Sequence, residues 1–423
     1  MLRFSGSSFH SVRRYDGPLA NLSADHVCGE AARVSKLCPM VTAPKSPHDA
    51  KPLRVLTVVS GDLWAGAEMQ VFHLLRAASR EPSVELHAAV LNPGMLADRL
   101  AAEDIAVTVL DESQLGFKDL AREIRALARK WRPAVVHTHR RKEHVLGALA
   151  AKACEAGLVA TVHGRTELPQ GWNGLRQSVL RMLERTLLAR LYCRLIAVSD
   201  ELTDYLPGPA ERKIVIPNSV DVDAVREAGM AGLAPAVNRG VVQIAFLGRL
   251  VPVKQVHHIL EMMPLLQAAH PGRWALHIIG DGPLRQKLEQ QAVQLGLGRA
   301  MTFHGFLPNP LPLLAQMDLL LFASAHEGLP MTALEALALG VPIFSPPIGS
   351  LQRLIEESDA GAVARSARPG DLADALMNLR FVVRPESALR PALLPERYHI
   401  ANGVGSTLAL WHQVATRSPI AVP

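Results

Sequence analysis

The sequence predicts an α/β protein with two doubly wound domains that face a central cleft. Its 423 residues exceed what one hydrophobic core usually serves, so two domains are expected. From Arg54 onward, short β-branched runs alternate with longer helical patterns, as in βαβ units with a parallel sheet. The alternation stops over residues 217–240, which are rich in Pro, Gly, Asn and Ala, and resumes at Val241. Each half of the chain is therefore predicted to form its own parallel sheet.

Short apolar runs mark the strands of both domains. The first domain is predicted to hold six strands, over residues 54–59, 85–90, 105–110, 134–138, 158–163 and 194–198. The second is predicted to hold five, over residues 241–247, 274–279, 300–303, 319–322 and 342–344. The runs are almost continuously apolar, as expected for strands covered on both faces. Sheets of this kind bind ligands beyond the carboxyl ends of their strands, so functional residues are expected on those loops.

The predicted division of the chain follows from these runs. It comprises a loosely ordered extension, a first domain, a linker, a second domain, and a C-terminal helix and tail that can pack back on the first domain. The corresponding ranges are 1–50, 51–218, 219–240, 241–400 and 401–423. The extension mixes Ser, Arg, His and Pro without periodicity, which is why it is excluded from the predicted fold.

The composition favours an ordinary globular protein inside the cell. Hydrophobic residues make up 49% of the chain and charged residues 20%, and the net charge of +6 is mild for this length. There is no apolar run long enough to span a membrane and no secretory signal at the start. We therefore expect a cytoplasmic protein with no nucleic-acid partner. The four cysteines, Cys28, Cys38, Cys154 and Cys193, are too far apart to suggest a zinc site or a disulfide framework.

Residues 330–339 predict a short buried helix that carries one carboxylate. Pro330 suits the first turn and Gly340 suits the position after the last. The residues between them are apolar except Thr332 and Glu335, and a helix that is apolar all round is buried. A carboxylate in such a helix needs polar partners, because an unpaired one is strongly destabilising. Sugar hydroxyls are suitable partners, so Glu335 is predicted to bind a ligand.

Glu327 lies just before this helix, at its positive end. Free backbone N–H groups and the helix dipole favour an anion such as phosphate there. The segment Glu327-Gly328-Leu329-Pro330, together with Glu335, therefore suits a ligand that carries both hydroxyls and phosphate. The alternative is structural, with both carboxylates capping the helix or pairing with an arginine.

Two turns after strands of the second domain offer further contacts. Arg249 and Lys254 follow the strand over 241–247, beside Gly248, and two cations there can meet a diphosphate from two directions. The turn Gly280-Asp281-Gly282-Pro283 follows the next strand, and its backbone can face a nucleotide base. A surface pair of cations and a plain tight turn are the alternatives.

Three loops of the first domain end at the same edge of its sheet. Gly66 follows the first strand, His139 follows the strand over 134–138, and His163 ends the strand over 158–163. Histidines at strand ends can hydrogen-bond hydroxyls or act as bases near neutral pH. A structural role for each histidine is the alternative. His137-Thr138-His139 has no third ligand at a suitable spacing, so no metal site is predicted.

A basic stretch over residues 175–194 has two interpretations. It interleaves arginines with leucines, namely Arg176, Arg181, Arg185, Arg190 and Arg194 with Leu175, Leu180, Leu183, Leu187 and Leu191. Such a helix can lie on an anionic membrane surface that presents a lipid-linked acceptor. Alternatively, its leucines pack on the sheet and its arginines are solvated.

In this order, the motifs resemble the retaining nucleotide-sugar glycosyltransferases of the GT-B fold whose hallmark is Glu-x7-Glu, usually called family 4. The resemblance spans roughly residues 53–365. Its most specific part runs from Glu327 through Glu335 to Pro342, which is similar to the family pattern EGxPxxxLEAxAxGxP. Further segments match in order: Ile216–Asp221, Gly280–Pro283 and Phe303–Gly305.

The resemblance implies two Rossmann-like domains and sugar transfer with retention of configuration. It implies that Glu327 holds the transferred sugar, Glu335 the ribose hydroxyls, and Arg249 with Lys254 the donor diphosphate. His139 would face the sugar beside the acceptor, with Gly66 and His163 on the same side. The leaving diphosphate would deprotonate the incoming hydroxyl, so neither a protein nucleophile nor a cofactor is required. The expected substrates are a UDP- or GDP-sugar and a cell-surface glycan or lipid-linked acceptor, at the inner face of the cytoplasmic membrane.

The sequence also departs from the family pattern near the substrate loops. Ala65-Gly66 stands where Gly-Gly is common, Ser219 and Gln255 replace common glycines, and residues 345–350 lack a glycine pair and an acidic residue. These departures leave the identity of the substrates open. Two rival functions remain: a non-catalytic regulatory protein that binds nucleotide sugars, and a sugar-nucleotide epimerase of the same fold, which would lack the Glu-x7-Glu order.

Overall fold

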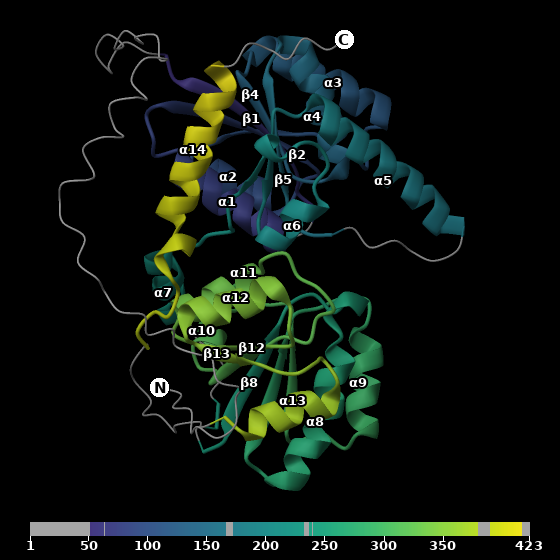
Figure 1. The fold of residues 1–423 in the computed structure, drawn as a ribbon, viewed down its shortest axis with the longest axis vertical. Helices are drawn as coiled ribbons and strands as arrows, with labels where there is room; N and C mark the ends of the chain where they lie inside the picture. Colours follow the sequence, from purple (N-terminus) through teal and green to yellow (C-terminus); the bar gives the residue numbers. More distant parts are fainter. Residues whose placement is uncertain are drawn as a thin grey trace, which may run out of the picture. The chain divides into compact units, whose positions relative to one another are not determined.

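A computed structural model describes residues 51–62, 64–165, 172–231, 237–238, 240–379 and 390–416 of the protein, with the backbone alone for residues 172–177. The predicted N-terminal extension, with Cys28 and Cys38, and the last residues of the predicted tail lie outside this part of the chain. So do the side chains of Leu175 and Arg176. Figure 1 shows the elements of both halves, coloured along the sequence.

The first half of the chain forms a parallel sheet of seven strands in the order β3-β2-β1-β4-β5-β6-β7. The strands are β1 Leu53–Ser60, β2 Val84–Leu91, β3 Ala106–Val109, β4 Val135–Thr138, β5 Gly157–Val162, β6 Arg194–Ala197 and β7 Lys213–Val215. Strand β1 pairs with β2 on one side and with β4 on the other, so the strand order reverses beside β1. This is the doubly wound arrangement, in which ligands bind outside the carboxyl ends of the strands at the reversal.

The second half forms another parallel sheet, of six strands in the order β10-β9-β8-β11-β12-β13. Its strands are β8 Val242–Leu247, β9 Trp274–Ile279, β10 Met301–Gly305, β11 Leu319–Leu321, β12 Ile343–Ser345 and β13 Gly361–Val363. The reversal lies at β8, which pairs with both β9 and β11. The predicted α/β class with two doubly wound domains is thereby confirmed.

Helices connect the parallel strands, as crossover connections require. In the first half they are α1 Gly66–Ala78, α2 Met95–Ala102, α3 Phe117–Trp131, α4 Arg141–Cys154, α5 Trp172–Leu191, α6 Asp200–Tyr205, η1 Ala210–Arg212 and α7 Val222–Met230. In the second half they are η2 Pro252–Lys254, α8 Val256–Ala269, α9 Arg285–Gln294, α10 Leu311–Leu314, α11 Met331–Ala338 and α12 Gly349–Ser358. After the last strand follow α13 Pro369–Met377, η3 Glu396–Tyr398 and α14 Ile400–Thr416.

The last helix, α14, belongs to the core of the first half. It contacts α1 and the strands β1, β4 and β5, and Figure 1 shows it in yellow beside them. Trp411 of α14 is fully buried, among apolar side chains such as Val55 and Val135. The chain therefore returns to the first sheet after completing the second.

Three elements were not predicted from the sequence. Strands β7 and β13 are only three residues long, too short for an apolar run to stand out. Helix α7 lies within the range predicted as a linker. Its first turn is capped by the Asp221 side chain, which accepts a hydrogen bond of 3.1 Å from the Ala224 N–H. Asp221 is a favourable capping residue, but the surrounding Pro, Gly and Ala residues are typical of a linker, so the sequence did not predict this helix.

Candidate active site

A cavity of about 480 Å³ lies at the carboxyl ends of the strands and is lined by both halves of the chain. The first half contributes residues at the start of α1, among them Trp64 and Gly66, and His163 after β5. The second half contributes Arg249 after β8, Gly280 and Asp281 after β9, and the segment from Glu327 to Glu335. We call this space the main cavity. Most site residues predicted from the sequence line it; His139 and Gly282 do not.

Lys254 and Glu327 form an ion pair in the main cavity. The Lys254 ammonium lies 2.5 Å from Glu327 Oε1, and the Ser324 hydroxyl donates to the same oxygen at 2.6 Å. The side chains are 22% and 10% exposed, so the pair is largely withdrawn from water. One carboxylate oxygen of Glu327 therefore has two donors, and its ionic partner is the predicted site residue Lys254 rather than an arginine.

Arg249 lies at the rim of the main cavity and is exposed. Within the described ranges, its guanidinium has no hydrogen bond or ion pair, in contrast to Lys254. A guanidinium in this position keeps its donors available for an anionic ligand. Of the two cations that follow strand β8, Lys254 is therefore paired with Glu327, and Arg249 is unpaired within the described ranges.

Glu335 is the most deeply buried carboxyl of the main cavity. It lies in the middle of α11, where it is 3% exposed, and its neighbours Ala333, Leu334 and Ala336 are buried as well. Burial raises the pKa of Glu335 from 4.5 to about 8. No hydrogen bond or ion pair reaches this carboxyl from any side chain that the structure describes. The expected helix over 330–339 is confirmed, and Gly340 ends it with a φ of 73°.

The turn after β9 is shaped by close backbone contacts. Gly280 has a φ of 131°, and a Cβ at this position would overlap the carbonyl oxygen of Gly248. A Cβ on Gly282 would likewise overlap the backbone of Leu250. Gly282 does not line the main cavity, so its evident role is to let the two loops touch. The Asp281 carboxylate accepts from the Gly282 N–H at 2.7 Å and from Arg285 at 2.8 Å.

The two predicted histidines of the first half lie side by side. His139 Nδ1 and His163 Nε2 are 3.1 Å apart, and burial lowers the pKa of both rings well below the usual value. Both imidazoles are therefore neutral at physiological pH. His163 lines the main cavity, whereas His139 lines a second cavity of about 450 Å³, which His163 also borders. His139 therefore contacts a residue of the main cavity, His163, without lining that cavity itself.

Contacts between the two halves fix the segment before α11. A Cβ on Gly328 would overlap the carbonyl oxygen of His163, so only glycine allows this approach. The Asn218 side-chain amide donates to the Leu329 carbonyl at 2.7 Å. Asn218 was not predicted as a site residue, although it lies in one of the segments that match the family pattern. Trp64 and Phe306 also line the main cavity without having been predicted.

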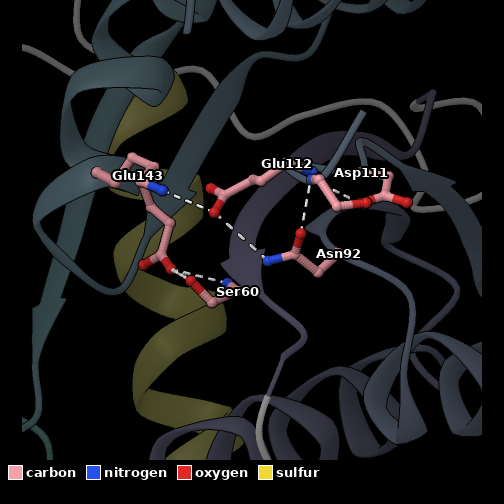
Figure 2. A network of polar contacts seen from close by, with 7 residues as sticks. Ser60, Asn92, Asp111, Glu112 and Glu143 are labelled. Atoms are coloured by element: carbon pink, nitrogen blue, oxygen red, sulfur yellow. Dashed lines mark hydrogen bonds and ion pairs between the residues drawn. The ribbon is translucent and has the colours of Figure 1, made fainter. Parts of the chain in front are cut away.

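A polar network ties together the ends of β1, β2 and β3 in the first half (Figure 2). The Ser60 N–H donates to Glu143 at 2.7 Å, the Ser60 hydroxyl also contacts this carboxylate, and Lys142 lies 2.6 Å from Glu112. The Glu112 N–H donates to Asn92 at 2.9 Å. Glu143 is fully buried, and burial raises its pKa to about 7. The residues of this network come from separate segments, so no periodic pattern in the sequence indicates it; it connects the loops that follow these strands.

Within the described part of the chain, no group of three or more His, Cys, Asp and Glu side chains is arranged to hold a metal ion. None of the helices there is both long and apolar enough to cross a membrane.

Comparisons with known proteins identify both halves. Residues 64–224 match the family model described as Glycosyltransferase Family 4, and residues 235–380 match that described as Glycosyl transferases group 1. A glycogen synthase of Mycobacterium tuberculosis is 29% identical over 297 residues, which cover 68% of each protein. The 2-deoxystreptamine glucosyltransferase of Streptomyces kanamyceticus is 32% identical over 48% of this chain and 55% of its own. The lipopolysaccharide 1,6-galactosyltransferase of Salmonella typhimurium is 30% identical over 39% and 45%.

Solved structures show the same fold. Anabaena Alr3699/HepE in complex with UDP-glucose superposes with a TM-score of 0.68 at 18% identity, covering 85% of this chain and all of that one. WaaG, a glycosyltransferase involved in lipopolysaccharide biosynthesis, superposes with a TM-score of 0.57 at 13% identity, covering 88% of this chain and 97% of its own. At these identities the likeness concerns the fold alone. The two family matches, one in each half, and this shared architecture establish that the chain is a glycosyltransferase of the GT-B fold.

Proposed function

We propose that the chain transfers a hexose-type sugar, with retention of configuration, from a UDP- or GDP-sugar to a hydroxyl of a cell-surface glycan or lipid-linked acceptor. The observation that carries this proposal is the content of the main cavity, where Arg249 and Lys254 lie with the carboxyls of Glu327 and Glu335. Cations of this kind suit a diphosphate, and carboxyls suit sugar hydroxyls. A nucleotide sugar presents both groups in one molecule.

The relatives support the same substrate class. Those named above act, by their names, in glycogen synthesis, on 2-deoxystreptamine and on lipopolysaccharide. Alr3699/HepE was solved with UDP and with UDP-glucose. These acceptors differ from one another, so the relatives support sugar transfer in general and leave the acceptor to experiment.

The proposed mechanism uses the charges of the second half. Arg249 and Lys254 stabilise the negative charge that develops on the leaving diphosphate. Glu327 accepts hydrogen bonds from hydroxyls of the transferred sugar while Lys254 holds it in place. Glu335 accepts from the ribose. The leaving phosphate takes the proton of the incoming hydroxyl on the same face of the sugar, and the neutral His139 and His163 act from the acceptor side by hydrogen bonding.

A turnover assay tests the proposal against its two rivals. The purified protein is incubated with a panel of nucleotide sugars, with and without a membrane extract, and nucleoside diphosphate release is followed. Release that depends on the extract supports transfer, and the anomeric configuration of the product, read by NMR, tests retention. Binding without release would favour the regulatory protein, and sugar isomerisation without release would favour the epimerase.

We expect a metal chelator to leave this turnover unchanged. Two cationic side chains, Arg249 and Lys254, line the main cavity and can contact a diphosphate, so we propose that the reaction needs no bound cofactor. The measurement is the rate of nucleoside diphosphate release before and after addition of EDTA, followed by dialysis and re-addition of Mg²⁺ or Mn²⁺. A loss of activity that either ion restores would contradict this prediction.

We also propose that helix α5 contacts the inner face of the cytoplasmic membrane. Four neighbouring apolar side chains on α5 are exposed, with Met182 at 62% and Leu183 at 57%; the other two are Val179 and Leu180. By contrast, Leu188 of the same helix is buried in the core. The alternative in which all leucines pack on the sheet therefore fails for Leu180 and Leu183. Arg181 and Arg190 on this helix can meet anionic headgroups.

Replacing Met182 and Leu183 together by serine is expected to weaken binding to anionic vesicles about tenfold, from the apolar area that insertion would otherwise bury. Co-sedimentation with vesicles of phosphatidylglycerol and phosphatidylcholine gives the measurement. The matched control is Val293→Ser on α9, since Val293 is 80% exposed and lies in the other half of the chain. Equal binding of the double variant and wild type would contradict the contact.

A further inference from the structure

The second cavity, next to the main one, has more cationic than anionic side chains in its lining. Four arginines line it, from the start of α4, the loop after β5 and helix α5: Arg140, Arg141, Arg165 and Arg185. Among the lining residues that the structure describes, Glu184 is the only carboxylate. The cavity encloses about 450 Å³ and meets the main cavity at Ala67 and His163. It therefore places a positively charged space directly beside the proposed donor.

Half of this positive charge is neutralised by the protein. Arg141 lies 2.8 Å from the Glu184 carboxylate, and Arg140 lies 2.5 Å from that of Glu68, which is fully buried. Arg165 and Arg185 have no carboxylate partner in the described part of the chain. Arg185 donates to the Tyr205 carbonyl at 2.5 Å and lies over the Tyr205 ring, which orients its guanidinium without cancelling its charge.

The histidines of the second cavity add hydrogen-bonding atoms and no charge. Burial lowers the pKa of His144 and His163 to about 3, so both rings are neutral. His139 Nε2 and His163 Nδ1 are buried without a hydrogen-bond partner among the described residues. Neutral imidazoles can hydrogen-bond a hydroxyl group of a ligand at the border with the main cavity. An anionic group of that ligand can then lie further away, at the arginines.

Helix α5 extends the cationic lining. A neighbouring hollow along α5 is lined by Arg181, Arg185 and Arg190, and by no carboxylate from the described part of the chain. Arg185 lines both spaces, so the positive charge continues from the second cavity along the helix. The exposed Met182 also borders this hollow. An acceptor that is polar at one end, anionic in the middle and apolar at the other end matches this order of groups.

We propose that the second cavity binds the acceptor, and that this acceptor carries a phosphate group held by Arg165 and Arg185. The inference rests on the proposed sugar transfer and specifies its acceptor. Guanidinium groups from two separate segments can each form charge-assisted hydrogen bonds to different oxygens of one phosphate. The acceptor hydroxyl then lies beside His163, at the border with the donor.

Calorimetric titration with inorganic pyrophosphate tests the site without a known acceptor. The wild type is expected to bind it at two places, the main and the second cavity. Arg249→Gln should remove the first, and Arg165→Gln or Arg185→Gln should weaken the second about tenfold, as expected for one charge-assisted hydrogen bond. Arg129→Gln, at an exposed arginine on α3 outside both cavities, is the matched control.

The variants separate this inference from the proposed function. Unchanged binding in both Arg165→Gln and Arg185→Gln would overturn the phosphate site. Unchanged pyrophosphate binding in Arg249→Gln alone would contradict the proposed donor site and would not affect the proposed phosphate site in the second cavity. Arg165 lies in an exposed loop, so its variant remains informative if the loss of the Tyr205 contact unfolds Arg185→Gln.

Two further probes distinguish the source of the phosphate. Glycerol 3-phosphate presents it in soluble form, and phosphatidic acid in phosphatidylcholine vesicles presents it on a lipid. Competition with pyrophosphate by the vesicles, lost in Arg165→Gln, would assign a lipid-linked acceptor. Competition by glycerol 3-phosphate alone would assign a soluble one. The absence of competition by either would overturn the proposal.

Discussion

Replacing Lys254 by alanine is expected to lower kcat/KM for sugar transfer by about 10²–10³, the loss seen when one preorganised donor to a developing negative charge is removed. Lys254 is 22% exposed in the main cavity and lies 2.5 Å from Glu327. Its removal takes a cation from the proposed diphosphate site. It also leaves the Glu327 carboxylate, which is 10% exposed, with Ser324 as its remaining side-chain donor.

A double-mutant cycle separates these two effects. Glu327→Gln keeps the size of the side chain and removes its charge, and the double variant removes the pair. If Lys254 acts on the diphosphate as well as on Glu327, then Lys254→Ala should be slower than Glu327→Gln. Lys142→Ala is the control, because it breaks an ion pair of 2.6 Å with Glu112 outside both cavities. Full activity of Lys254→Ala would contradict the proposed stabilisation of the diphosphate by Lys254.

The parallel sheets were predictable because their strands are short apolar runs between helical patterns. Every predicted strand corresponds to an observed one, with ends that differ by a residue or two, as between the predicted range 300–303 and β10 at 301–305. Strand pairing adds information that a single run does not contain. Strand β13, for example, pairs with β12 at Ile343 and Gly361, and only the finished sheet identifies it.

The site was predictable where one segment contains the signal. Glu335 was the lone charge in an apolar helix, and its burial follows from that pattern. The Lys254 and Glu327 pair joins residues 73 positions apart, which only the packing of two loops brings together. The same holds for the second cavity, whose arginines come from separate segments that become neighbours when β4, β5 and α5 assemble.

Two departures from the family pattern have structural explanations. Gln255 has a φ of 48°, in the left-handed region that favours glycine, so the common glycine suits the backbone and glutamine is tolerated with some strain. Ser219 is buried, and a Cβ on Gly403 of α14 would overlap its hydroxyl. A glycine on the last helix therefore makes room for the serine that replaces a glycine earlier in the chain.

Replacing Glu335 by glutamine is expected to remove a steep pH dependence of stability. The pKa of Glu335 is raised from 4.5 to about 8 in the folded state. Between these two pH values the Glu335 carboxyl is therefore protonated in the folded state and ionised in the unfolded state. The free energy of unfolding of the wild type should therefore fall as pH rises from about 4.5 to 8, by up to about 1.4 kcal/mol per pH unit from this group. Glu335→Gln lacks the ionisation, so its stability relative to wild type should increase across the same window, measured by urea unfolding.

The same carboxyl should couple donor binding to proton release. Ribose hydroxyls that donate to Glu335 favour its ionised form, so binding lowers the pKa of Glu335 and expels a proton near neutral pH. Affinity for UDP or GDP should then rise from pH 6 to 8 in the wild type and stay nearly flat in Glu335→Gln. Calorimetry in two buffers of different ionisation enthalpy counts the protons, and Glu123→Gln, at a partly exposed carboxylate on α3, is the control. Equal proton release by wild type and Glu335→Gln would place the ribose elsewhere.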